Sequence, residues 1–404
     1  MAERLSSNIV MVAGEASGDL LGGDLLGQLK TRFPTLNVWG VGGPRMQEQG
    51  LSGPYDVNDL SVIGLVEVIR RLPGLIRVFR YLTNLLKEKK PQLLITIDLP
   101  DFNFLLAARA KALGIPIVHY VSPQVWAWRS GRVNKIADLV DHLMVLFPFE
   151  AAIYSHTALP VSFVGHPLVE QLKPWMETRN NPEKKRELRR DLGILDHEKV
   201  VVLLPGSRHS EVKRLLAIML ATYEKVTKKG NCVRYVIAQA DTLSGQEFES
   251  LWPTGLNSAL TEESQKNILI RQGETHSLLA IADAALVASG TATLETALVG
   301  TPMVVIYRVN PLTYEIGKRV IRVPFIALAN LVAERKLVHE RIQEEANPEQ
   351  LADDLDNLLN NVHEVEEMQA GYQTIRNKLS QPLRLPVEIV ADMLTNAAQT
   401  TSGV

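Results

Sequence analysis

Short apolar runs alternate with longer helix-like stretches along most of the chain. In the first half, runs rich in Val, Ile and Leu lie at residues 8–13, 37–41, 93–98, 115–121, 142–147 and 161–164. They are apolar throughout, which is typical of strands covered on both faces in a parallel sheet. Helical patterns at 18–32, 102–113 and 131–140 supply the crossovers between them.

The alternation breaks at residues 174–191, PWMETRNNPEKKRELRRD, which we interpret as a linker. Strands are then predicted at 200–204, 233–237, 267–270, 284–288 and 303–306, and helix over 348–398. The pattern predicts two doubly wound, Rossmann-like α/β domains, at 1–180 and 190–375, followed by a helix and tail at 376–404. Ligands are expected where the carboxyl ends of the strands of the two domains face each other.

Composition supports this class and narrows the partners. A chain of 404 residues is long enough for two ordinary domains. Hydrophobic residues make up 46% and charged residues 22%, as in globular proteins. The formal net charge of −2 argues against a nucleic-acid partner, because a polyanion binder carries a basic excess.

The cellular compartment follows from what the sequence lacks. Cys232 is the only cysteine, which excludes an intrachain disulfide and fits a reducing cytosol. The first residues do not resemble a secretory signal, and no window offers about 18 uninterrupted apolar residues for a spanning helix. We therefore expect a cytoplasmic protein, soluble or peripheral to a membrane.

A candidate anion site follows the strand at 284–288, in the sequence SGTATLETALVGTP at 289–302. Gly290 allows close backbone approach, Thr291 is the expected N-cap, and the first-turn amides suit a diphosphate. Glu295 lies one turn further on the same face, where its carboxylate can accept hydrogen bonds from ribose hydroxyls. A capped structural helix with a solvated glutamate explains the same residues equally well.

A second strand–glycine–helix segment, LLPGSRHSEVKRL at 203–215, strengthens the anion-site hypothesis. Arg208 sits at the expected helix start near Ser207, where its guanidinium can bind phosphate, although a capping arginine on a loop is common. Two such segments in one domain are less common. The chain has no P-loop, and no G-x-G-x-x-G follows the first strand, so ATPase and dehydrogenase functions lose their usual support.

The first domain offers a candidate base. In LLITIDLPDFN, Asp98 ends an apolar strand, where a carboxylate is costly unless it is bonded or functional, and Asp101 is the expected cap of the next helix. Asp98 is either a general base for an acceptor hydroxyl or an acceptor of turn hydrogen bonds. The glycine loops at 13–26, with Gly14, and at 40–46 are weak signals, as are Trp126 and Trp128 as a cleft wall.

A basic amphipathic stretch lies at residues 61–86. Apolar residues at nearly helical spacing alternate with arginines, and Pro73 with Gly74 is expected to split the stretch into two short helices. The apolar positions that would meet an anionic bilayer are Val66, Ile69, Leu72 and Ile76. An ordinary core-facing helix with solvated arginines explains the pattern slightly better when it is taken alone.

Taken together, the motifs resemble the lipid-A-disaccharide synthase family of GT-B glycosyltransferases. The segments that carry the resemblance run in the family's order from residue 12 to 335: VAGEASGD, GVGGPRM, SVIGLVEV, IDLPDFN, HYVSPQVWAWR, FVGHPLVE, LLPGSRHSEV, ASGTATLETAL, PMVVIYR and ALANLVAER. Beyond Ala333 the match loosens, since Glu334 stands where a small residue is expected.

The resemblance implies an inverting transfer of diacylglucosamine from a UDP donor to the 6-hydroxyl of diacylglucosamine 1-phosphate. By this resemblance Asp98 is the base, Arg208 with the amides at Gly290 and Thr291 stabilises the departing diphosphate, and Glu295 holds ribose. Gly14, Ser289 and Asn330 are further candidates for donor contacts. The resemblance implies no cofactor and no metal, and it favours docking of residues 61–86 on the inner face of the inner membrane; a homodimer stays open.

Two alternatives compete with this hypothesis. Another GT-B enzyme that uses UDP-N-acetylglucosamine, such as the peptidoglycan glycosyltransferase or a UDP-sugar 2-epimerase, would share the nucleotide site. An epimerase would turn over the donor without a lipid acceptor. A membrane-bound nucleotide-sugar regulator would bind UDP without turnover.

Overall fold

The computed structural model describes residues 8–60, 65–125, 130–252, 266–320 and 323–402, without the side chains of 65–70, 130, 312, 316, 320 and 398–402. It divides the chain into two compact units. Unit 1 contains Met1–His166 together with Gln381–Val404, and unit 2 contains Pro167–Ser380. The last helix of the chain therefore belongs to the unit that begins it.

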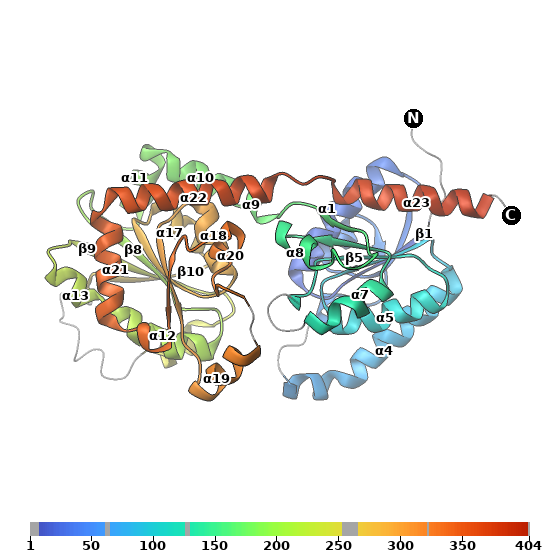
Figure 1. The fold of residues 1–404 in the computed structure, drawn as a ribbon, viewed down its shortest axis with the longest axis horizontal. Helices are drawn as coiled ribbons and strands as arrows, with labels where there is room; N and C mark the ends of the chain where they lie inside the picture. The colour runs from blue at the N-terminus through green and yellow to red at the C-terminus, as the bar shows by residue number, and fades with distance from the viewer. Residues whose placement is uncertain (1–7, 61–64, 126–129, 253–265, 321–322, 403–404) are drawn as a thin grey trace. The chain divides into compact units, whose positions relative to one another are not determined.

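Unit 1 is built on a seven-stranded parallel sheet in the order β3-β2-β1-β4-β5-β6-β7. Its strands are β1 (Asn8–Ala13), β2 (Asn37–Val41), β3 (Leu51–Ser52), β4 (Leu93–Ile97), β5 (Ile117–Tyr120), β6 (His142–Val145) and β7 (Val161–Phe163). Its helices include α1 (Ala16–Arg32), α2 (Pro44–Glu48), α3 (Val57–Leu60), α4 (Leu65–Lys89), α5 (Pro100–Ala112), α7 (Val133–Leu139), α8 (Pro148–Ile153) and α23 (Pro386–Ser402) (Figure 1).

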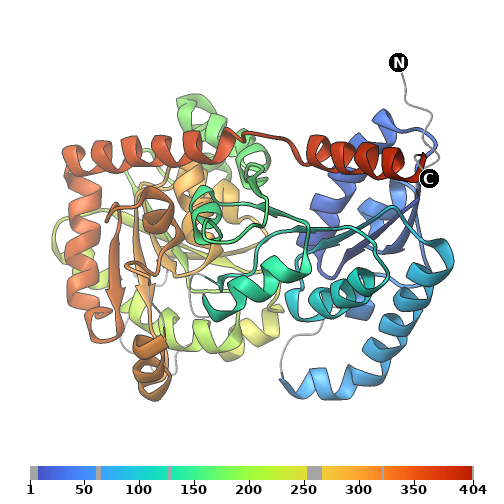
Figure 2. The ribbon, with the colours of Figure 1, turned by 45° about the vertical axis from the view of Figure 1, so that its right-hand side comes forward.

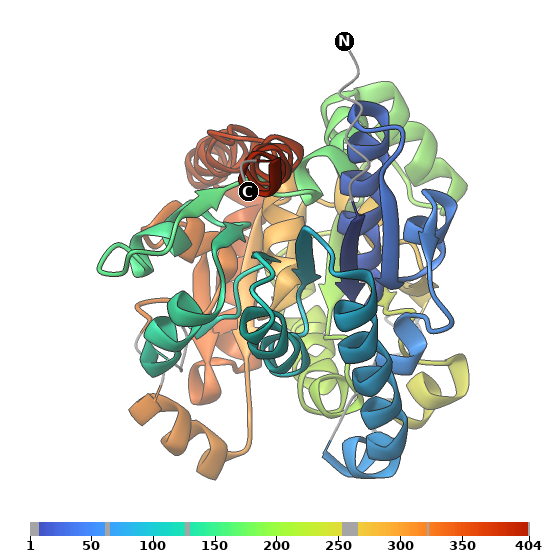
Figure 3. The same ribbon diagram turned by 90° about the vertical axis from the view of Figure 1, so that its right-hand side faces the viewer.

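Both faces of the unit 1 sheet are covered. Alternate residues of β1 point to opposite faces; Ile9 and Met11 join one core, and Val10 and Val12 join the other. The first core is closed by α1 and α23, the second by α4, α5 and α7, and Figures 2 and 3 show these two groups of helices on opposite sides of the sheet. This double burial explains why the strand sequences are apolar throughout.

Unit 2 carries a six-stranded parallel sheet in the order β10-β9-β8-β11-β12-β13. Its strands are β8 (Lys199–Leu204), β9 (Val233–Gln239), β10 (Ile268–Gln272), β11 (Ala284–Ala288), β12 (Met303–Tyr307) and β13 (His339–Ile342). The helices that concern the site are α12 (His209–Ala221), α17 (Thr275–Ile281), α18 (Thr291–Val299), α19 (Pro311–Val320) and α20 (Leu328–Ala333).

Each sheet has one point at which the strand order reverses. In unit 1 it lies between β1 and β4, and in unit 2 between β8 and β11. The connections that leave two such neighbouring strands diverge to opposite faces and open a crevice at the carboxyl ends, which is where open α/β sheets bind ligands. The segments that the sequence singled out, after β1 and β4 and after β8 and β11, are these connections.

The predicted linker at residues 174–191 is wrong. The stretch forms α10 (Lys173–Asn180) and α11 (Pro182–Asp191) inside unit 2. Arg179 donates to the carbonyl of Ala282 at 2.8 Å, and Arg189 donates to the carbonyl of Ile281 at 2.7 Å and pairs with Asp283 at 2.7 Å. The charged residues satisfy carbonyls where α17 ends, so their polarity reflects packing. The boundaries found at His166 and Ser380 accordingly differ from those predicted.

The remaining secondary structure agrees closely with the sequence pattern. All eleven predicted strands are present; the short β3 and the charged β13 were not predicted. The C-terminal segment is helical as α21 (Pro348–Asn360), α22 (Val362–Ser380) and α23. The predicted split at Pro73 is wrong, because α4 is one helix with Pro73 inside it. Among the described residues, no helix has the length and apolarity needed to cross a bilayer.

Candidate active site

A cavity of about 320 Å³ lies at the strand-order reversal of unit 2. It is formed by the turn from β8 to α12 and the turn from β11 to α18, with one side closed by the start of α17. Five predicted site residues line it together: Arg208, Ser289, Gly290, Thr291 and Glu295. The two segments that the sequence analysis treated separately therefore make a single site.

The turn into α18 presents open backbone at the cavity. Gly290 is the N-cap, with φ of +156°, so the predicted cap at Thr291 is wrong by one residue. A side chain at Gly290 would meet no atom within 4 Å. The turn is fixed from the other side, because Ser289 Oγ donates to the Ile326 carbonyl at 2.9 Å and Thr293 Oγ1 donates to the Gly290 carbonyl at 2.8 Å. The Thr293 amide donates to the Gly290 carbonyl at 3.1 Å, whereas Gly290, Thr291 and Ala292 line the cavity, so the start of α18 can offer backbone amides to an anion.

Glu295 lies one turn into α18 with its carboxylate held by a histidine. His276, in the first turn of α17, lies with its Nε2 3.0 Å from Glu295 Oε2. The glutamate side chain is 21% exposed and the histidine side chain 38% exposed. One carboxylate oxygen is therefore engaged within the protein, and among the described residues Oε1 has no hydrogen-bond partner. The sequence analysis missed His276, since only the fold brings α17 beside α18.

The turn into α12 is organised by Glu211. Its Oε2 accepts the backbone amides of Ser207 at 3.2 Å and Arg208 at 3.3 Å, and its Oε1 pairs with Arg208 Nη1 at 3.2 Å. The helix starts at His209 with Arg208 as N-cap, two residues later than predicted. Gly206 has φ of +114°, and a Cβ there would lie 2.6 Å from the Glu211 carboxylate. Glu211 thus fixes the Arg208 backbone at the cavity edge, while the Arg208 side chain is 76% exposed.

Asn330, the remaining candidate in this unit, does not line the cavity. It is fully buried, and its amide group is used within the protein. Its Nδ2 donates to the Val338 carbonyl at 3.0 Å and to Glu340 Oε1 at 2.9 Å, and its Oδ1 accepts the amides of Leu337 and Val338 at 2.8 and 2.9 Å. This saturated amide ties α20 to β13, which is a structural role.

Asp98 lies at the strand-order reversal of unit 1, in a strained turn. Asp98 and Leu99 have φ of +51° and +44°, a conformation that L-residues other than Asn and Asp rarely adopt. Asn103, fully buried on α5, holds the turn by donating to the Asp98 carbonyl at 2.7 Å and the Ile97 carbonyl at 3.3 Å. Leu99, rather than the predicted Asp101, is the N-cap of α5; Asp101 instead pairs with Arg132 at 2.9 Å.

The electrostatics of this turn favour proton uptake. Burial raises the pKa of Asp98 above its ordinary value, although the Leu99 amide, which donates to Oδ1 at 2.8 Å, partly lowers it. Burial and the charge of Asp98 also raise the pKa of Glu15, which follows Gly14 at the start of α1. The pKa values of two carboxyl groups on neighbouring connections are thus both raised, and the carboxylate of each is a stronger base than a solvated one.

Gly14 has a steric role beside Asp98. A Cβ at this position would lie 2.4 Å from Leu99 Cδ2, so glycine lets the Leu99 side chain pack closely against the first loop. Of the other polar groups in the first glycine loop, Asp19 is buried and accepts the amides of Arg45 and Met46 at 3.1 and 3.0 Å, which caps α2. Asp19 is therefore structural. Trp126 and Trp128 lie outside the described residues.

The predicted membrane residues lie on α4. Leu72 is 47% exposed and Ile76 is 43% exposed, so two large apolar side chains one helical turn apart face solvent together. The side chains of Val66 and Ile69 lie outside those that the structure describes. Val78 and Leu82, two and six residues after Ile76, are buried in the core, so α4 packs by one face and exposes apolar residues on another.

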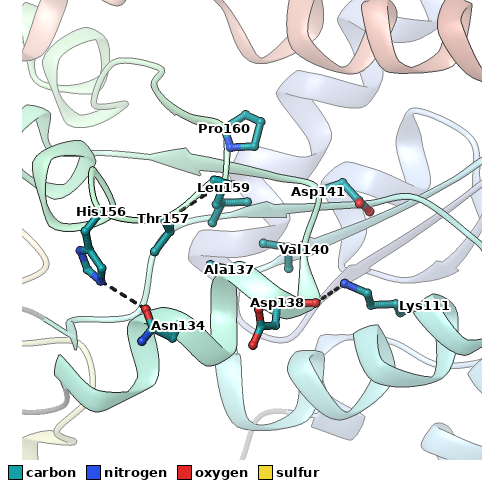
Figure 4. A pocket seen from close by; sticks show the side chains of 11 residues that line it. Lys111, Asn134, Ala137, Asp138, Val140, Asp141, His156, Thr157, Leu159 and Pro160 are labelled. Atoms are coloured by element: carbon teal, nitrogen blue, oxygen red, sulfur yellow. Dashed lines mark hydrogen bonds between the residues drawn. The ribbon is translucent and has the colours of Figure 1, made fainter.

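A further hollow of about 390 Å³ lies at the amino ends of β6 and β7 (Figure 4), away from the strand carboxyl ends. Its polar side chains are largely engaged within the unit: His156 with Asn134 at 3.2 Å, Lys111 with the Asp138 carbonyl, and Asp141 with the Ile117 amide at 2.8 Å. We assign it no ligand.

Comparison with known proteins gives matches over nearly the whole chain. The sequence profile of the family described as lipid-A-disaccharide synthetase matches residues 9–391. The lipid-A-disaccharide synthase of Pseudomonas aeruginosa is 42% identical over 373 residues, which cover 92% of this chain and 95% of that protein. The synthase of Geobacter sulfurreducens is 38% identical over 379 residues, 94% of each chain.

Solved structures with low sequence identity share the fold. The UDP-GlcNAc 2-epimerase of Neisseria meningitidis, bound to UDP-GlcNAc, aligns with a TM-score of 0.58 at 15% identity over 96% of this chain and all of that one. The calicheamicin glycosyltransferase CalG4 aligns with a TM-score of 0.53 at 14% identity over 97% and 98% of the two chains. These likenesses confirm the predicted GT-B fold, and with the sequence matches they show that the chain belongs to the lipid-A-disaccharide synthase family of UDP-sugar glycosyltransferases.

Proposed function

We propose that the cavity of unit 2 binds the UDP part of a UDP-diacylglucosamine donor and that Asp98 activates the 6-hydroxyl of a diacylglucosamine 1-phosphate acceptor. The observation that carries the proposal is the joining of Arg208, Glu295 and the open start of α18 in one cavity at the strand-order reversal. A diphosphate needs donors and positive potential, whereas a ribose needs an acceptor for its hydroxyls; this cavity offers both.

Arg208 is suited to exchange its partner when the diphosphate binds. Its ion pair with Glu211 is exposed on the arginine side, and such pairs contribute only about 0.2–1 kcal/mol. A diphosphate at the start of α18 would offer the guanidinium a more highly charged partner. Glu211 would keep the turn in place through the Ser207 and Arg208 amides. Binding would thus cost little reorganisation of the backbone.

Glu295 would accept hydrogen bonds from the ribose hydroxyls through Oε1. Its other carboxylate oxygen faces His276 Nε2 at 3.0 Å, which restricts the side chain to one orientation. Because Glu295 follows Gly290 by more than one helical turn, a nucleotide can place its diphosphate at the helix start and its ribose beside the glutamate.

Asp98 would take the proton of the acceptor hydroxyl as the oxygen attacks the anomeric carbon. UDP leaves with its pair of electrons, and attack from the opposite side inverts the anomeric configuration. A departing diphosphate needs no general acid, because Arg208 and the first-turn amides of α18 would stabilise its charge. One base is therefore enough, in contrast to the paired carboxyl groups of glycoside hydrolysis.

The lipid nature of both substrates accounts for the exposed apolar residues of α4. We propose that Leu72 and Ile76, with Val66 and Ile69, enter the surface of an anionic membrane and bring the enzyme to its substrates. The arginines beside them would meet acidic headgroups.

The deciding experiment is mass spectrometry of the products formed from both acylated glucosamine substrates. We expect a β-1,6-linked disaccharide 1-phosphate and UDP from the wild type, and almost no disaccharide from Asp98→Ala, with unchanged affinity for UDP. Asp101→Ala, a carboxylate on the same turn, is the matched control and should stay active. Near-normal activity of Asp98→Ala would refute the assignment of the base.

The nucleotide assignment has a separate test. Arg208→Ala should weaken UDP binding by about tenfold or more, since a charged hydrogen bond contributes about 1.5–3 kcal/mol. Arg214→Ala, on the exposed face of the same helix, is the control. Donor turnover without the acceptor would point instead to an epimerase.

A further inference from the structure

We propose that a groove between α4 and α5 seats one anionic phospholipid of the bilayer, separate from either substrate. The groove has a volume of about 340 Å³, and its lining includes Phe79, Arg80 and Lys87 from α4 and Arg109 and Leu113 from α5 and its end. The inference builds on the membrane docking proposed for α4. It adds a binding site, a ligand class and a second helix.

The floor of the groove is apolar. Phe79 packs edge to face on Phe102 of α5, with ring centroids 5.9 Å apart, and so closes the bottom between the helices. Leu113 is 44% exposed at the far side, and Leu105, on the same face of α5, is 62% exposed. On α4, Leu72 and Ile76 continue this exposed apolar surface. Apolar side chains left open in such number on two adjacent helices indicate a partner with apolar surface.

The rim of the groove is cationic. Arg80 and Lys87 of α4 and Arg109 of α5 are exposed, and none of them forms an ion pair with another described residue. Lysines and arginines near helix carboxyl ends often merely compensate the helix dipole. Arg80 lies well inside α4, however, and all three surround the same apolar floor. An acyl chain along the floor with a phosphate between the three cations satisfies both features.

The position of the groove argues for a bilayer lipid rather than an acceptor molecule. Asp98 lies just before α5, whereas Arg109 and Leu113 lie at the other end of that helix. At 1.5 Å per residue, Arg109 is roughly 15 Å along the helix from the base. A lipid held there cannot present a hydroxyl to Asp98. Its role would be to hold the α4–α5 face against the membrane, which Figures 2 and 3 show on one side of the unit 1 sheet.

The test uses the full-length protein and short-chain lipids below their micellar concentration. Dihexanoyl phosphatidylglycerol should bind with a stoichiometry of one by calorimetry, and dihexanoyl phosphatidylcholine at least fivefold more weakly. Arg80→Ala and Arg109→Ala should each weaken phosphatidylglycerol binding about fivefold, and Leu113→Ser should weaken both lipids. Lys184→Ala and Leu195→Ser, exposed residues of unit 2, are the matched controls.

Equal affinity for the two lipids, absence of saturation, or insensitivity to all three groove variants would overturn the inference. Transfer between detergent-dispersed substrates distinguishes this failure from failure of the proposed function. The groove variants should retain this transfer activity, because their residues line neither the cavity of unit 2 nor the turn at Asp98. If the wild-type protein transferred the sugar but did not bind phosphatidylglycerol, only the groove inference would fail. If the wild-type protein showed no transfer, only the proposed function would fail.

Discussion

At the scale of a single residue, the turn at Asp98 places backbone strain and a buried carboxylate at the residue proposed as the base. Two consecutive residues with positive φ cost roughly 1–2 kcal/mol each, and a buried carboxylate adds a desolvation cost. The protein maintains the turn with the Asn103 clamp and with glycine at position 14. Such a combination at the carboxyl end of a central strand is typical of a catalytic residue rather than of an ordinary turn.

Replacement of Asp98 by Asn should therefore separate activity from stability. We expect disaccharide formation to fall by about 10²–10⁴-fold, because an amide cannot act as the base. The free energy of unfolding at pH 7 should stay equal or rise, because a raised folded-state pKa stabilises the fold only below the unfolded-state pKa, and that contribution is lost as pH rises through the raised value. Asparagine also tolerates positive φ.

The measurement is urea unfolding of the wild type and the Asn variant between pH 4 and pH 8. The difference in favour of the variant should grow with pH over the window above the ordinary carboxyl pKa. A buried acid with a raised pKa should make the Asn variant relatively more stable as pH rises. A variant that is less stable than the wild type at pH 7 and more stable at pH 4 would contradict this expectation. The wild-type rate of transfer should fall as pH decreases through the raised pKa of Asp98.

His276 is the residue-scale prediction for the nucleotide cavity. His276→Ala should raise KM for the donor by about 3–10-fold and leave kcat nearly unchanged, because it frees the Glu295 carboxylate without removing it. His276→Gln, which can still donate from a side-chain amide, should recover most of the affinity. His363→Ala, an exposed histidine of α22, is the control. A fall in kcat at unchanged KM would contradict a positioning role.

The sequence revealed these residues to different degrees, for physical reasons. Asp98, Arg208 and Glu295 lie at or shortly after the ends of apolar strands, and such strand ends can be recognised in the sequence. His276 cannot be recognised in this way, because its partnership with Glu295 depends on two helices meeting. The sequence does not indicate that the Asn330 amide group is buried, and in the structure all four of its hydrogen bonds are made within the fold.

At the scale of an element, the same limits appear in α10 and α11. Their sequence is rich in charge, Asn and Pro, and it was interpreted as a linker. Asn181 is instead the N-cap of α11, accepting the amides of Glu183 and Lys184, and Pro182 occupies the first turn where its missing amide costs little. The capping signal was present in the sequence. The sequence did not show that Arg179 and Arg189 donate hydrogen bonds to carbonyls around the end of α17.

The α4 helix carries the prediction for membrane binding. Serine at Val66, Ile69, Leu72 and Ile76 should lower binding to anionic vesicles by roughly tenfold or more, because an exposed Leu or Ile gains about 1–2 kcal/mol when a bilayer covers it. Circular dichroism should show an intact fold, since Leu72 and Ile76 are already exposed. Leu195→Ser, at an apolar side chain of unit 2 that is 57% exposed, should not change binding. Sedimentation with vesicles measures the effect, and equal binding by the fourfold variant would refute the proposal.

At the scale of the whole molecule, the two units share the same type of sheet. Each unit has a parallel sheet with one reversal of strand order, and each reversal carries one half of the proposed chemistry: the base in unit 1 and the nucleotide cavity in unit 2. Alternating apolar strands and helices predicted both sheets. Where the chain leaves one unit and returns to it could not be predicted, because α22 and α23 look alike as helical sequence.

The return of the chain gives the last prediction. Ile389, Val390 and Leu394 of α23 are almost fully buried in the core that contains Met11 and Leu25. Leu394→Ala should cost about 2–5 kcal/mol of folding free energy. The loss should be confined to unit 1, so amide exchange should speed up in β1 and β4 and stay unchanged in β8 and β11. UDP affinity should persist, because no residue of α23 lines the cavity of unit 2.

Leu383→Ala, at a side chain that is 92% exposed just before α23, is the control and should change exchange in neither sheet. If exchange accelerated equally in both sheets, α23 would stabilise both units and not unit 1 alone. The two units would then not be independently stable, and a division of the proposed chemistry between two independent cores would be refuted.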